Sequence, residues 1–140
     1  MDVLYTAEAL STGQGRDGRV VSSDGTVDLT MAVPKEMGGS GAGSNPEQLF
    51  AAGYAACFHS ALNAVARGKK LDLGDSSVGG RVQIGPNGEG GFQLAVLLEV
   101  VIPNLAHDEA QALADAAHQV CPYSNATRGN IDVTITVSED

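Results

Sequence analysis

Two cysteines are the side chains in this sequence best suited to nucleophilic or redox chemistry. Cys57 stands between an alanine pair and Phe58, and Cys121 stands 64 positions later, directly before Pro122. Apolar neighbours raise the pKa of a thiol, because they solvate the thiolate poorly. By its neighbours alone, Cys57 is therefore more typical of a small core residue than of a nucleophile. A nearby cation is needed to activate it.

The two thiols suit different roles if both lie on helices. Cys57 is expected about 18 Å from the start of its helix, too far for the helix dipole to lower its pKa. Cys121 is expected in the last turn of a later helix, where the negative end of the dipole disfavours a thiolate. These positions suggest the hypothesis that Cys57 reacts with a substrate and that Cys121 resolves the product as a disulfide.

A metal site is an alternative use of the same residues. Cys57, His59, His118 and Cys121 together offer two sulfurs and two imidazoles. Residues two apart on a helix point about 200° away from each other, so Cys57 and His59 face one ion only if the helix breaks. His59, His107 and His118 are each more typical of a helix surface or of a hydrogen-bonded core histidine. A cysteine hydrolase would also need a third, orienting residue, and none is recognisable.

The helix expected to carry the first cysteine has clear signals at both ends. Asn45 is an N-cap residue, Pro46 suits the first helical position, and Glu47 and Gln48 place polar and negative groups in the first turn. Basic residues and Gly68 mark its end. Because its apolar residues lie on most sides, we expect this central helix to be buried nearly all round.

The remaining elements surround this helix. We expect strands at residues 3–10, 19–23, 26–31, 81–84, 92–102 and 132–138, and a second helix from Asn104 that ends at Pro122. The glycine-rich segment 34–44 lacks the lysine of a phosphate-binding loop and is expected to be a mobile connector. Strand runs separated by single helices predict an α+β fold with a largely antiparallel sheet. The length of 140 residues predicts a single domain, residues 1–140.

Charge and composition exclude several classes of partner. Eight Lys and Arg stand against 17 Asp and Glu, and the formal charge of −9 disfavours nucleic acid and anionic lipid. The longest uncharged apolar run, Leu49–Phe58, is about half the length that spans a bilayer, so we expect no transmembrane helix. The N-terminus has no secretory signal pattern, which predicts a cytoplasmic protein. In that reducing compartment, lone cysteines are more often reactive or buried than structurally bridged.

Three sequence motifs together point to one protein family. They are Gly15-Arg16-Asp17-Gly18, the run from Asn45 through Tyr54 to Ala56-Cys57-Phe58, and the run from Val120-Cys121-Pro122 to Asn130. In this order they closely resemble the organic hydroperoxide resistance proteins of the OsmC-like family, from Val3 to the last strand. One departure is local: the loop before Arg16 is one residue longer than is usual in that family.

The resemblance implies a fold, an activity and partners. The implied fold is OsmC-like, with largely antiparallel sheets packed around central helices in an intertwined homodimer. The implied activity is that of a bacterial thiol peroxidase in the oxidative stress response, which reduces organic hydroperoxides, including lipid-derived ones, to alcohols. The implied reductant is dihydrolipoamide or a lipoylated protein. No metal, haem, flavin or other cofactor is implied.

The resemblance also assigns four residues. Cys57 matches the peroxidatic cysteine, Cys121 the resolving cysteine, Arg16 the catalytic arginine and Glu47 its acidic partner. Arg16 then supplies the missing cation, because its charge and hydrogen bonds lower the pKa of Cys57 and its planar fork can orient a peroxide oxygen. Alternatives are an OsmC-type peroxidase with less selectivity for organic peroxides, a non-enzymatic thiol sensor, or a zinc-binding module.

Helix geometry predicts a composite site. Glu47 and Cys57 are ten residues apart, so an unbroken helix separates their backbones by about 15 Å and their side chains by about 80°. One arginine cannot readily clamp both from the same chain unless the helix breaks at Gly53 or the first strands fold back. A two-fold axis that lays two central helices antiparallel brings Glu47 of one chain near the partner subunit's Cys57.

Overall fold

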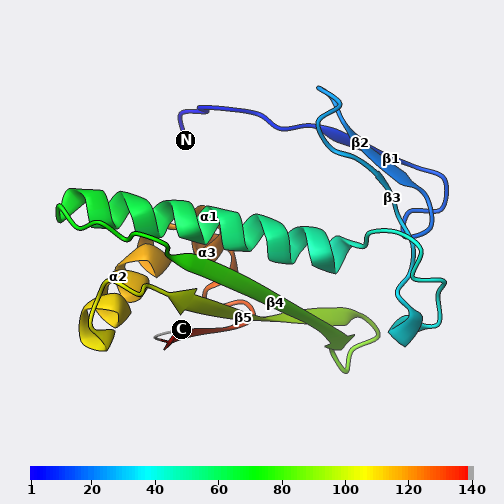
Figure 1. The fold of residues 1–140 in the computed structure, drawn as a ribbon. Helices are drawn as coiled ribbons and strands as arrows, with labels where there is room; N and C mark the ends of the chain where they lie inside the picture. Colours follow the sequence, from blue (N-terminus) through cyan, green and yellow to red (C-terminus); the bar gives the residue numbers. More distant parts are fainter. Residues whose placement is uncertain (139–140) are drawn as a thin grey trace. The chain divides into compact units, whose positions relative to one another are not determined.

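A computed structural model describes residues 1–138 of the chain. By its internal contacts the chain divides into two compact units, residues 1–49 and residues 50 onward, and each is described separately. The element order is three short strands, a 3-10 helix, a long helix, two strands, two helices and a final strand (Figure 1). The α+β class predicted from the sequence is confirmed.

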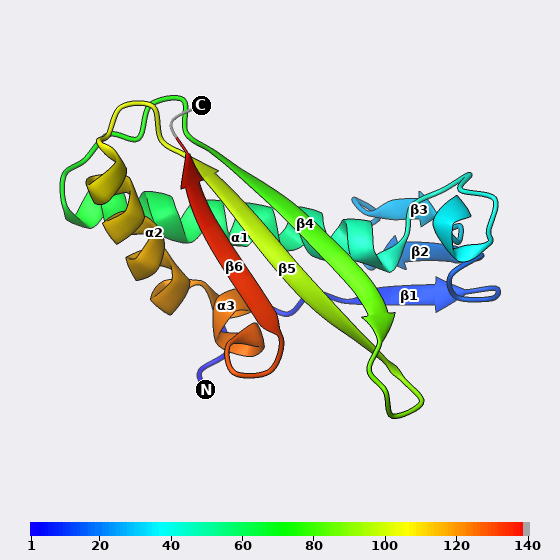
Figure 2. The same ribbon diagram turned by 90° about the horizontal axis from the view of Figure 1, so that it is seen from below.

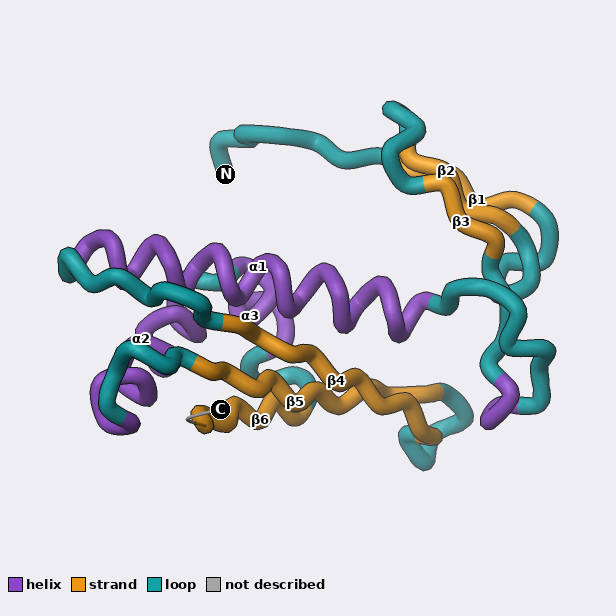
Figure 3. The backbone as a smooth tube through the Cα atoms, in the orientation of Figure 1, coloured by secondary structure: helices purple, strands orange, loops and turns teal. Residues whose placement is uncertain are grey.

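The first unit contains a three-stranded antiparallel sheet in the order β1-β2-β3, drawn in orange beyond the teal N-terminal segment (Figure 3). Its strands are β1 (Ala9–Thr12), β2 (Arg19–Ser22) and β3 (Asp28–Thr30). The prediction of a strand over residues 3–10 is wrong for residues 3–8. The β2 strand ends at Ser22 and a turn follows, so the pairing before Ala9 is reduced to one hydrogen bond, from the Ser23 N–H to the Glu8 carbonyl oxygen at 2.9 Å.

The connector between β3 and the long helix is tied to the sheet by backbone hydrogen bonds. Met31 and Ser44 form a parallel bridge, and the 3-10 helix η1 (Lys35–Met37) lies between them. Gly43 passes so close to β3 that an added Cβ would stand 2.5 Å from the Thr30 carbonyl oxygen. A side chain at this position therefore forces the connector away from β3.

The long helix α1 spans Pro46–Gly68, with the ends that the sequence predicts. Its N-terminus is a reciprocal cap, in which Asn45 Oδ1 accepts from the Gln48 N–H at 2.9 Å and Gln48 Oε1 accepts from the Asn45 N–H at 3.3 Å. The helix is not buried all round, contrary to the prediction. Buried residues occupy one face, and the opposite face is exposed in the single chain; the buried set is Tyr54, Phe58, Ala61, Leu62 and Ala66.

The second unit contains a sheet in the order β4-β5-β6 (Figure 2). The strands are β4 (Ser77–Pro86), β5 (Phe92–Val101) and β6 (Asp132–Ser138). The strand predicted at residues 81–84 therefore begins four residues earlier and ends two residues later than predicted. The β4-β5 pair is antiparallel, as predicted, but β5-β6 is parallel, with Val96 opposite Val133. A parallel pair needs a long crossover, and here two helices supply it.

The crossover consists of α2 (His107–Val120) and α3 (Pro122–Thr127). The predicted helix from Asn104 begins too early, its predicted end at Pro122 is right, and the short helix α3 beyond Pro122 was not predicted. Ala106 holds the N-cap position of α2, while the Asn104 side chain donates to the Asp72 carbonyl oxygen. Pro122 ends α2 but also begins α3, because the first helical position leaves its backbone nitrogen without a partner in any case.

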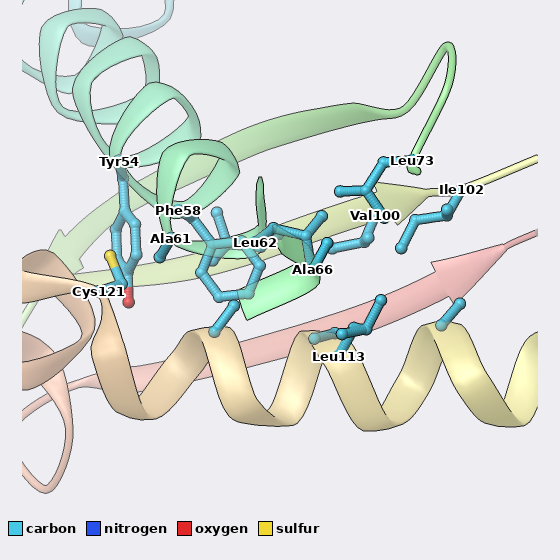
Figure 4. Close-up of a cluster of buried hydrophobic side chains, with 14 of the residues drawn as sticks. Tyr54, Phe58, Ala61, Leu62, Ala66, Leu73, Val100, Ile102, Leu113 and Cys121 are labelled. Carbon is cyan, nitrogen blue, oxygen red and sulfur yellow. The ribbon is translucent and has the colours of Figure 1, made fainter. Parts of the chain in front are cut away.

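The core lies between one face of the second sheet and the two helices α1 and α2 (Figure 4). Alternate residues of β5, including Val96, Leu98 and Val100, point into it, as the two-residue period of a strand requires. Phe58 and Leu62 of α1 are fully buried against this cluster. Cys121 is part of the same cluster, so the second thiol is held by the core itself.

The helix α1 is also long and apolar enough to cross a membrane by length and composition. The sequence prediction judged the apolar segment too short to span a bilayer, because it counted only the unbroken apolar run Leu49–Phe58. The whole helix, with its interspersed polar residues, is long enough. A core helix of a soluble protein passes the same test, so the finding is weak evidence for a membrane. The buried face of α1 packs into the core of an α+β fold that has no clear membrane-protein character across residues 1–138.

Candidate active site

Arg16 and Glu47 form a two-pronged ion pair in the first unit. Arg16 Nη1 donates to Glu47 Oε2 at 2.8 Å and Nη2 donates to Oε1 at 2.7 Å. The Glu47 side chain is 14% exposed and the Arg16 side chain 36%. Hydrogen bonding from Arg16 lowers the pKa of Glu47, so the pair is fully charged at neutral pH. The contact between these two residues agrees with the family resemblance, which made Glu47 the acidic partner of Arg16. Their catalytic roles stay predictions.

The loop between β1 and β2 presents Arg16. Gly13 and Gly15 have φ values of 77° and 68°, and Gly18 donates its N–H to the Gly15 carbonyl at 3.1 Å, which closes a tight turn. An added Cβ on Gly18 would stand 1.9 Å from a backbone oxygen. Asp17 Oδ1 accepts from the Val33 N–H at 3.1 Å and so ties the loop to the start of the connector. The Gly-Arg-Asp-Gly motif thus builds the loop as well as supplying the arginine.

Cys57 and Cys121 lie together in the second unit although they are far apart in sequence. Cys57 is on α1, Cys121 is the junction residue of α2 and α3, and their Sγ atoms are 3.7 Å apart, with both cysteines as free thiols. Cys121 is fully buried, whereas Cys57 is partly accessible. Solvent therefore has access to the thiol that is predicted to meet the substrate, and none to the thiol that is predicted to resolve it.

Burial and two neighbouring residues shift the pKa of Cys57. Burial raises the pKa of the Cys57 thiol, the backbone N–H of Tyr123 lowers it by hydrogen bonding, and Cys121 raises it. The net direction is upward, as the apolar neighbours of this residue predict. Activation by the positive charge of Arg16 stays a prediction.

A buried network of hydroxyl groups lies beside the thiols and was not predicted. Tyr54 Oη is 2.8 Å from Ser124 Oγ and 3.0 Å from Thr127 Oγ1, and Ser124 Oγ is 2.8 Å from His118 Nδ1. Tyr54 is one turn from Cys57, and Ser124 is one turn from Cys121. The signal was present in the sequence, since a tyrosine on an otherwise apolar helix face needs a polar partner for its hydroxyl.

Aromatic rings and an apolar groove adjoin this part of the second unit. The ring centroids of Tyr54 and Tyr123 are 5.7 Å apart, and Phe50 contacts both rings edge-on. A groove of about 620 Å³ begins beside Pro122 and Tyr123 and is lined largely by apolar side chains, Leu94 and Ile131 among them. Apolar surface is thus available next to the segment that carries Cys121.

The histidines have local partners. His59 Nε2 is 2.9 Å from Ser76 Oγ, and His118 is held in the network above, which confirms the reading of both as hydrogen-bonded histidines. His107 is exposed at the start of α2. Within residues 1–138, no three His, Cys, Asp or Glu side chains converge in a way that could hold a metal ion.

Comparisons with known proteins agree with this arrangement. A family model described as OsmC-like protein matches residues 38–136. An organic hydroperoxide resistance protein of Xanthomonas axonopodis pv. citri is 56% identical over 97% of this chain and 96% of its own length. Organic hydroperoxide resistance protein OhrB of Bacillus subtilis is 44% identical over 94% of this chain and 96% of its own.

The fold is similar to a solved structure as well. The crystal structure of an organic hydroperoxide resistance protein from Legionella pneumophila has a TM-score of 0.94 and 50% identity, and the match covers 98% of this chain and 99% of that one. The OsmC-like fold implied by the sequence motifs is confirmed. The chain belongs to the OsmC-like family and, within it, to the organic hydroperoxide resistance proteins.

Proposed function

We propose that this protein is a thiol peroxidase that reduces organic hydroperoxides to alcohols and protects against oxidative stress. The observation that carries the proposal is the 3.7 Å separation of two free thiols, one partly accessible and one fully buried. The names of the relatives point to the same class of substrate. The apolar groove lined by Phe50, Pro122 and Tyr123 supports a preference for alkyl or lipid hydroperoxides over hydrogen peroxide.

The proposed reaction has two steps, an oxidation by the peroxide and a condensation of the two cysteines. The Cys57 thiolate attacks one peroxide oxygen, the O–O bond breaks, and the alkoxide leaves and is protonated to the alcohol. Cys57 is thereby oxidised to a sulfenic acid. The Cys121 thiol then attacks the Cys57 sulfur, an S–S bond replaces the S–O bond, and the hydroxyl group leaves with the thiol proton as water.

Arg16 and Glu47 support the first step in this proposal. The positive charge of Arg16 favours the thiolate form of Cys57, and its planar fork orients the peroxide. Glu47 holds that fork through the two short hydrogen bonds between them. Without this cation, burial alone leaves Cys57 with a raised pKa and little thiolate at neutral pH.

The proposed reductant is dihydrolipoamide or a lipoylated protein. A dithiol that attacks the Cys57–Cys121 disulfide completes the exchange within one molecule, so no mixed disulfide accumulates. It returns two electrons and two protons to the cysteines and becomes a cyclic disulfide. A monothiol such as glutathione needs two separate encounters and is expected to be slower.

We also propose that the protein acts in the cytoplasm as a homodimer, with residues 1–140 as one functional domain in each subunit. The exposed face of α1 supports the dimer, because small residues recur there at every fourth position, namely Ala52, Ala56, Ser60 and Ala64. Such a face allows two helices to approach closely. The active site of the proposal takes Arg16 and Glu47 from one subunit and the cysteine pair from the other.

Turnover measurements test the proposed function. With dihydrolipoamide as reductant, cumene hydroperoxide is expected to be reduced much faster than hydrogen peroxide, and Cys57→Ser is expected to lose the activity because a serine hydroxyl offers almost no anion. Equal rates on both peroxides indicate the less selective OsmC-type enzyme. Turnover retained by Cys57→Ser contradicts the assignment.

Two further measurements separate the remaining alternatives. Wild-type protein that is oxidised by peroxide but never recycled by dihydrolipoamide or glutathione indicates a thiol sensor rather than a peroxidase. Stoichiometric zinc in the purified protein, measured by elemental analysis, indicates a zinc module. Equal rates with dihydrolipoamide and glutathione at matched thiol concentration contradict the proposed reductant.

A further inference from the structure

We propose that the buried hydrogen bond between Tyr54 and Ser124, extended by His118 and Thr127, is a positioning device that holds Cys121 within reach of Cys57. The inference rests on the proposed function, in which these two cysteines form a disulfide. It assigns a task to four side chains that make no contact with the peroxide in that mechanism.

The placement of the bond supports this task. Tyr54 precedes Cys57 by three residues on α1, and Ser124 of α3 follows Cys121, the N-cap residue of that helix, by three residues. On α1, residues three apart lie on the same side of the helix. The 2.8 Å bond from Tyr54 to Ser124 and the 3.7 Å contact of the two sulfurs are therefore neighbouring links between the same two segments.

The donors and acceptors of the network can be placed in one consistent order. Thr127 donates its hydroxyl proton to the Ser124 carbonyl oxygen at 3.3 Å, so Tyr54 must donate to Thr127. Ser124 must then donate to Tyr54, and His118 must carry its proton on Nδ1 and donate to Ser124.

In this hydrogen-bond network the hydroxyl groups of Tyr54, Ser124 and Thr127 each donate one hydrogen bond and accept another. Tyr54 and Ser124 are fully buried. Within residues 1–138, no buried side-chain nitrogen or oxygen lacks a partner. Removal of one hydroxyl group leaves its buried neighbours without a hydrogen-bond partner and without water to replace it, which is costly. The complete network is therefore expected to hold its geometry rigidly.

The main chain on both sides of Cys121 is fixed as well. The Cys121 N–H donates to the Ala117 carbonyl at 2.8 Å, and its own carbonyl accepts from Asn125 at 3.0 Å. Arg128 donates to the His118 carbonyl oxygen and to Asn125 Oδ1, so the end of α3 is tied to the end of α2. The Cys121 side chain therefore approaches Cys57 from an anchored backbone, and the Tyr54–Ser124 bond sets where that backbone lies.

The position of Cys121 matters for only one of the two steps, the condensation that forms the disulfide. Attack of Cys57 on the peroxide needs no contribution from Cys121. Disulfide formation needs the sulfurs to close from 3.7 Å to about 2.05 Å. The network should thus control how quickly the sulfenic acid on Cys57 is resolved, and how often a second peroxide oxidises it to sulfinic acid instead.

The test follows the two steps separately in the full-length protein. Reduced wild-type protein, Tyr54→Phe and Ser124→Ala are mixed with cumene hydroperoxide without reductant, and samples are quenched and analysed by mass spectrometry. Loss of the Cys57 thiol is expected within about twofold of wild type. Disulfide formation is expected to slow by about tenfold or more, as for a reacting group displaced by a fraction of an ångström. Sulfinic acid on Cys57 should rise in proportion.

Controls separate positioning from loss of stability. Leu113→Val weakens the α2 core without touching the network, and it is compared at a matched fall in melting temperature. Tyr5→Phe removes the same hydroxyl group from an exposed tyrosine. Both controls are expected to keep the wild-type ratio of disulfide to sulfinic acid at Cys57. In the double variant Tyr54→Phe/Ser124→Ala the two effects should not add, because both changes break one bond.

Each outcome has a clear meaning. Wild-type rates of disulfide formation in Tyr54→Phe and Ser124→Ala overturn the inference, and so does an equal slowing of both steps or a matched defect in Leu113→Val. If one variant fails to fold, the other still decides. Wild-type protein that consumes peroxide without a Cys57–Cys121 bond overturns the proposed function, and this inference with it.

Discussion

Cys57 has a pKa that opposes its proposed task. Burial is the main cause, and the thiol of Cys121 adds to it, while only the Tyr123 N–H acts in the other direction. A thiol with a raised pKa is mostly protonated at neutral pH and reacts slowly. The charge of Arg16 is the countering influence in the proposed mechanism, so the two effects can be separated by titration.

The rate of Cys57 oxidation is therefore expected to depend on Arg16 and on pH. In wild-type protein the rate should rise with pH through the pKa of Cys57 and then level off. In Arg16→Ala, burial acts without a compensating cation, so the midpoint should move to higher pH and the rate at neutral pH should fall. Stopped-flow measurement of the first oxidation step across pH gives both midpoints, and Arg19→Ala is the matched control. Coincident midpoints for wild type and Arg16→Ala would count against the activating role.

The second cysteine should affect the fate of the oxidised thiol rather than its formation. Cys121→Ser is expected to react with one equivalent of organic hydroperoxide and stop, because the sulfenic acid on Cys57 has no resolving partner. Excess peroxide should then produce sulfinic and sulfonic acid on Cys57, visible by mass spectrometry as added oxygen. Continued turnover of this variant with dihydrolipoamide would show that an external thiol resolves the sulfenic acid directly.

Among the elements, α1 depends on a cap that is local in sequence. Asn45 and Gln48 exchange two hydrogen bonds at its first turn, next to Glu47. Asn45→Ala should lower the free energy of unfolding by about 1 kcal/mol. Asn45→Asp, which keeps a capping oxygen, should lose little. Denaturant unfolding of the two variants checks this, and equal losses in both would mean that the cap contributes little.

Local signals explain which elements were predictable. The ends of α1 are encoded by Asn45, Pro46 and Gly68 themselves, so the sequence located them correctly. Pro122 was ambiguous, because a proline ends one helix and begins another equally well. The parallel pairing of β6 with β5 depends on the packing of two intervening helices, which no local pattern specifies.

The site divides in the same way. The sequence motifs predicted Arg16, Glu47 and both cysteines as site residues, and the structure places Arg16 against Glu47 and Cys57 against Cys121. The contacts of Ser124 were not predictable, because they join α1 to α3 across 70 positions of sequence. The exposed face of α1 was missed because small apolar residues look alike in a core and on a helix surface that another chain covers.

At the scale of the whole molecule, the helix that carries both Glu47 and Cys57 is unbroken, Gly53 included. Ten residues of helix keep their backbones about 15 Å apart. This continuity supports the proposal that Arg16 of one subunit serves the partner subunit's Cys57.

Subunit mixing tests that proposal. Cys57→Ser and Arg16→Ala homodimers are each expected to be inactive or nearly so. In their heterodimer, one site collects both lesions and the other is intact, so about half of the wild-type activity should return if the site is composite. The heterodimer is purified with two different affinity tags. If it stays inactive, Arg16 acts within its own chain.

The surroundings of Tyr54 also suggest that tyrosine fluorescence reports the redox state of the cysteine pair. The chain has no tryptophan and three tyrosines. Two of these, Tyr54 and Tyr123, lie 5.7 Å apart beside the thiol pair, and Figure 4 shows Cys121 next to the Tyr54 ring. A disulfide quenches tyrosine emission strongly, whereas a thiol quenches it weakly. Unlabelled protein should therefore dim on oxidation and brighten again when a dithiol reduces it, and Cys121→Ser should not show this reversible signal.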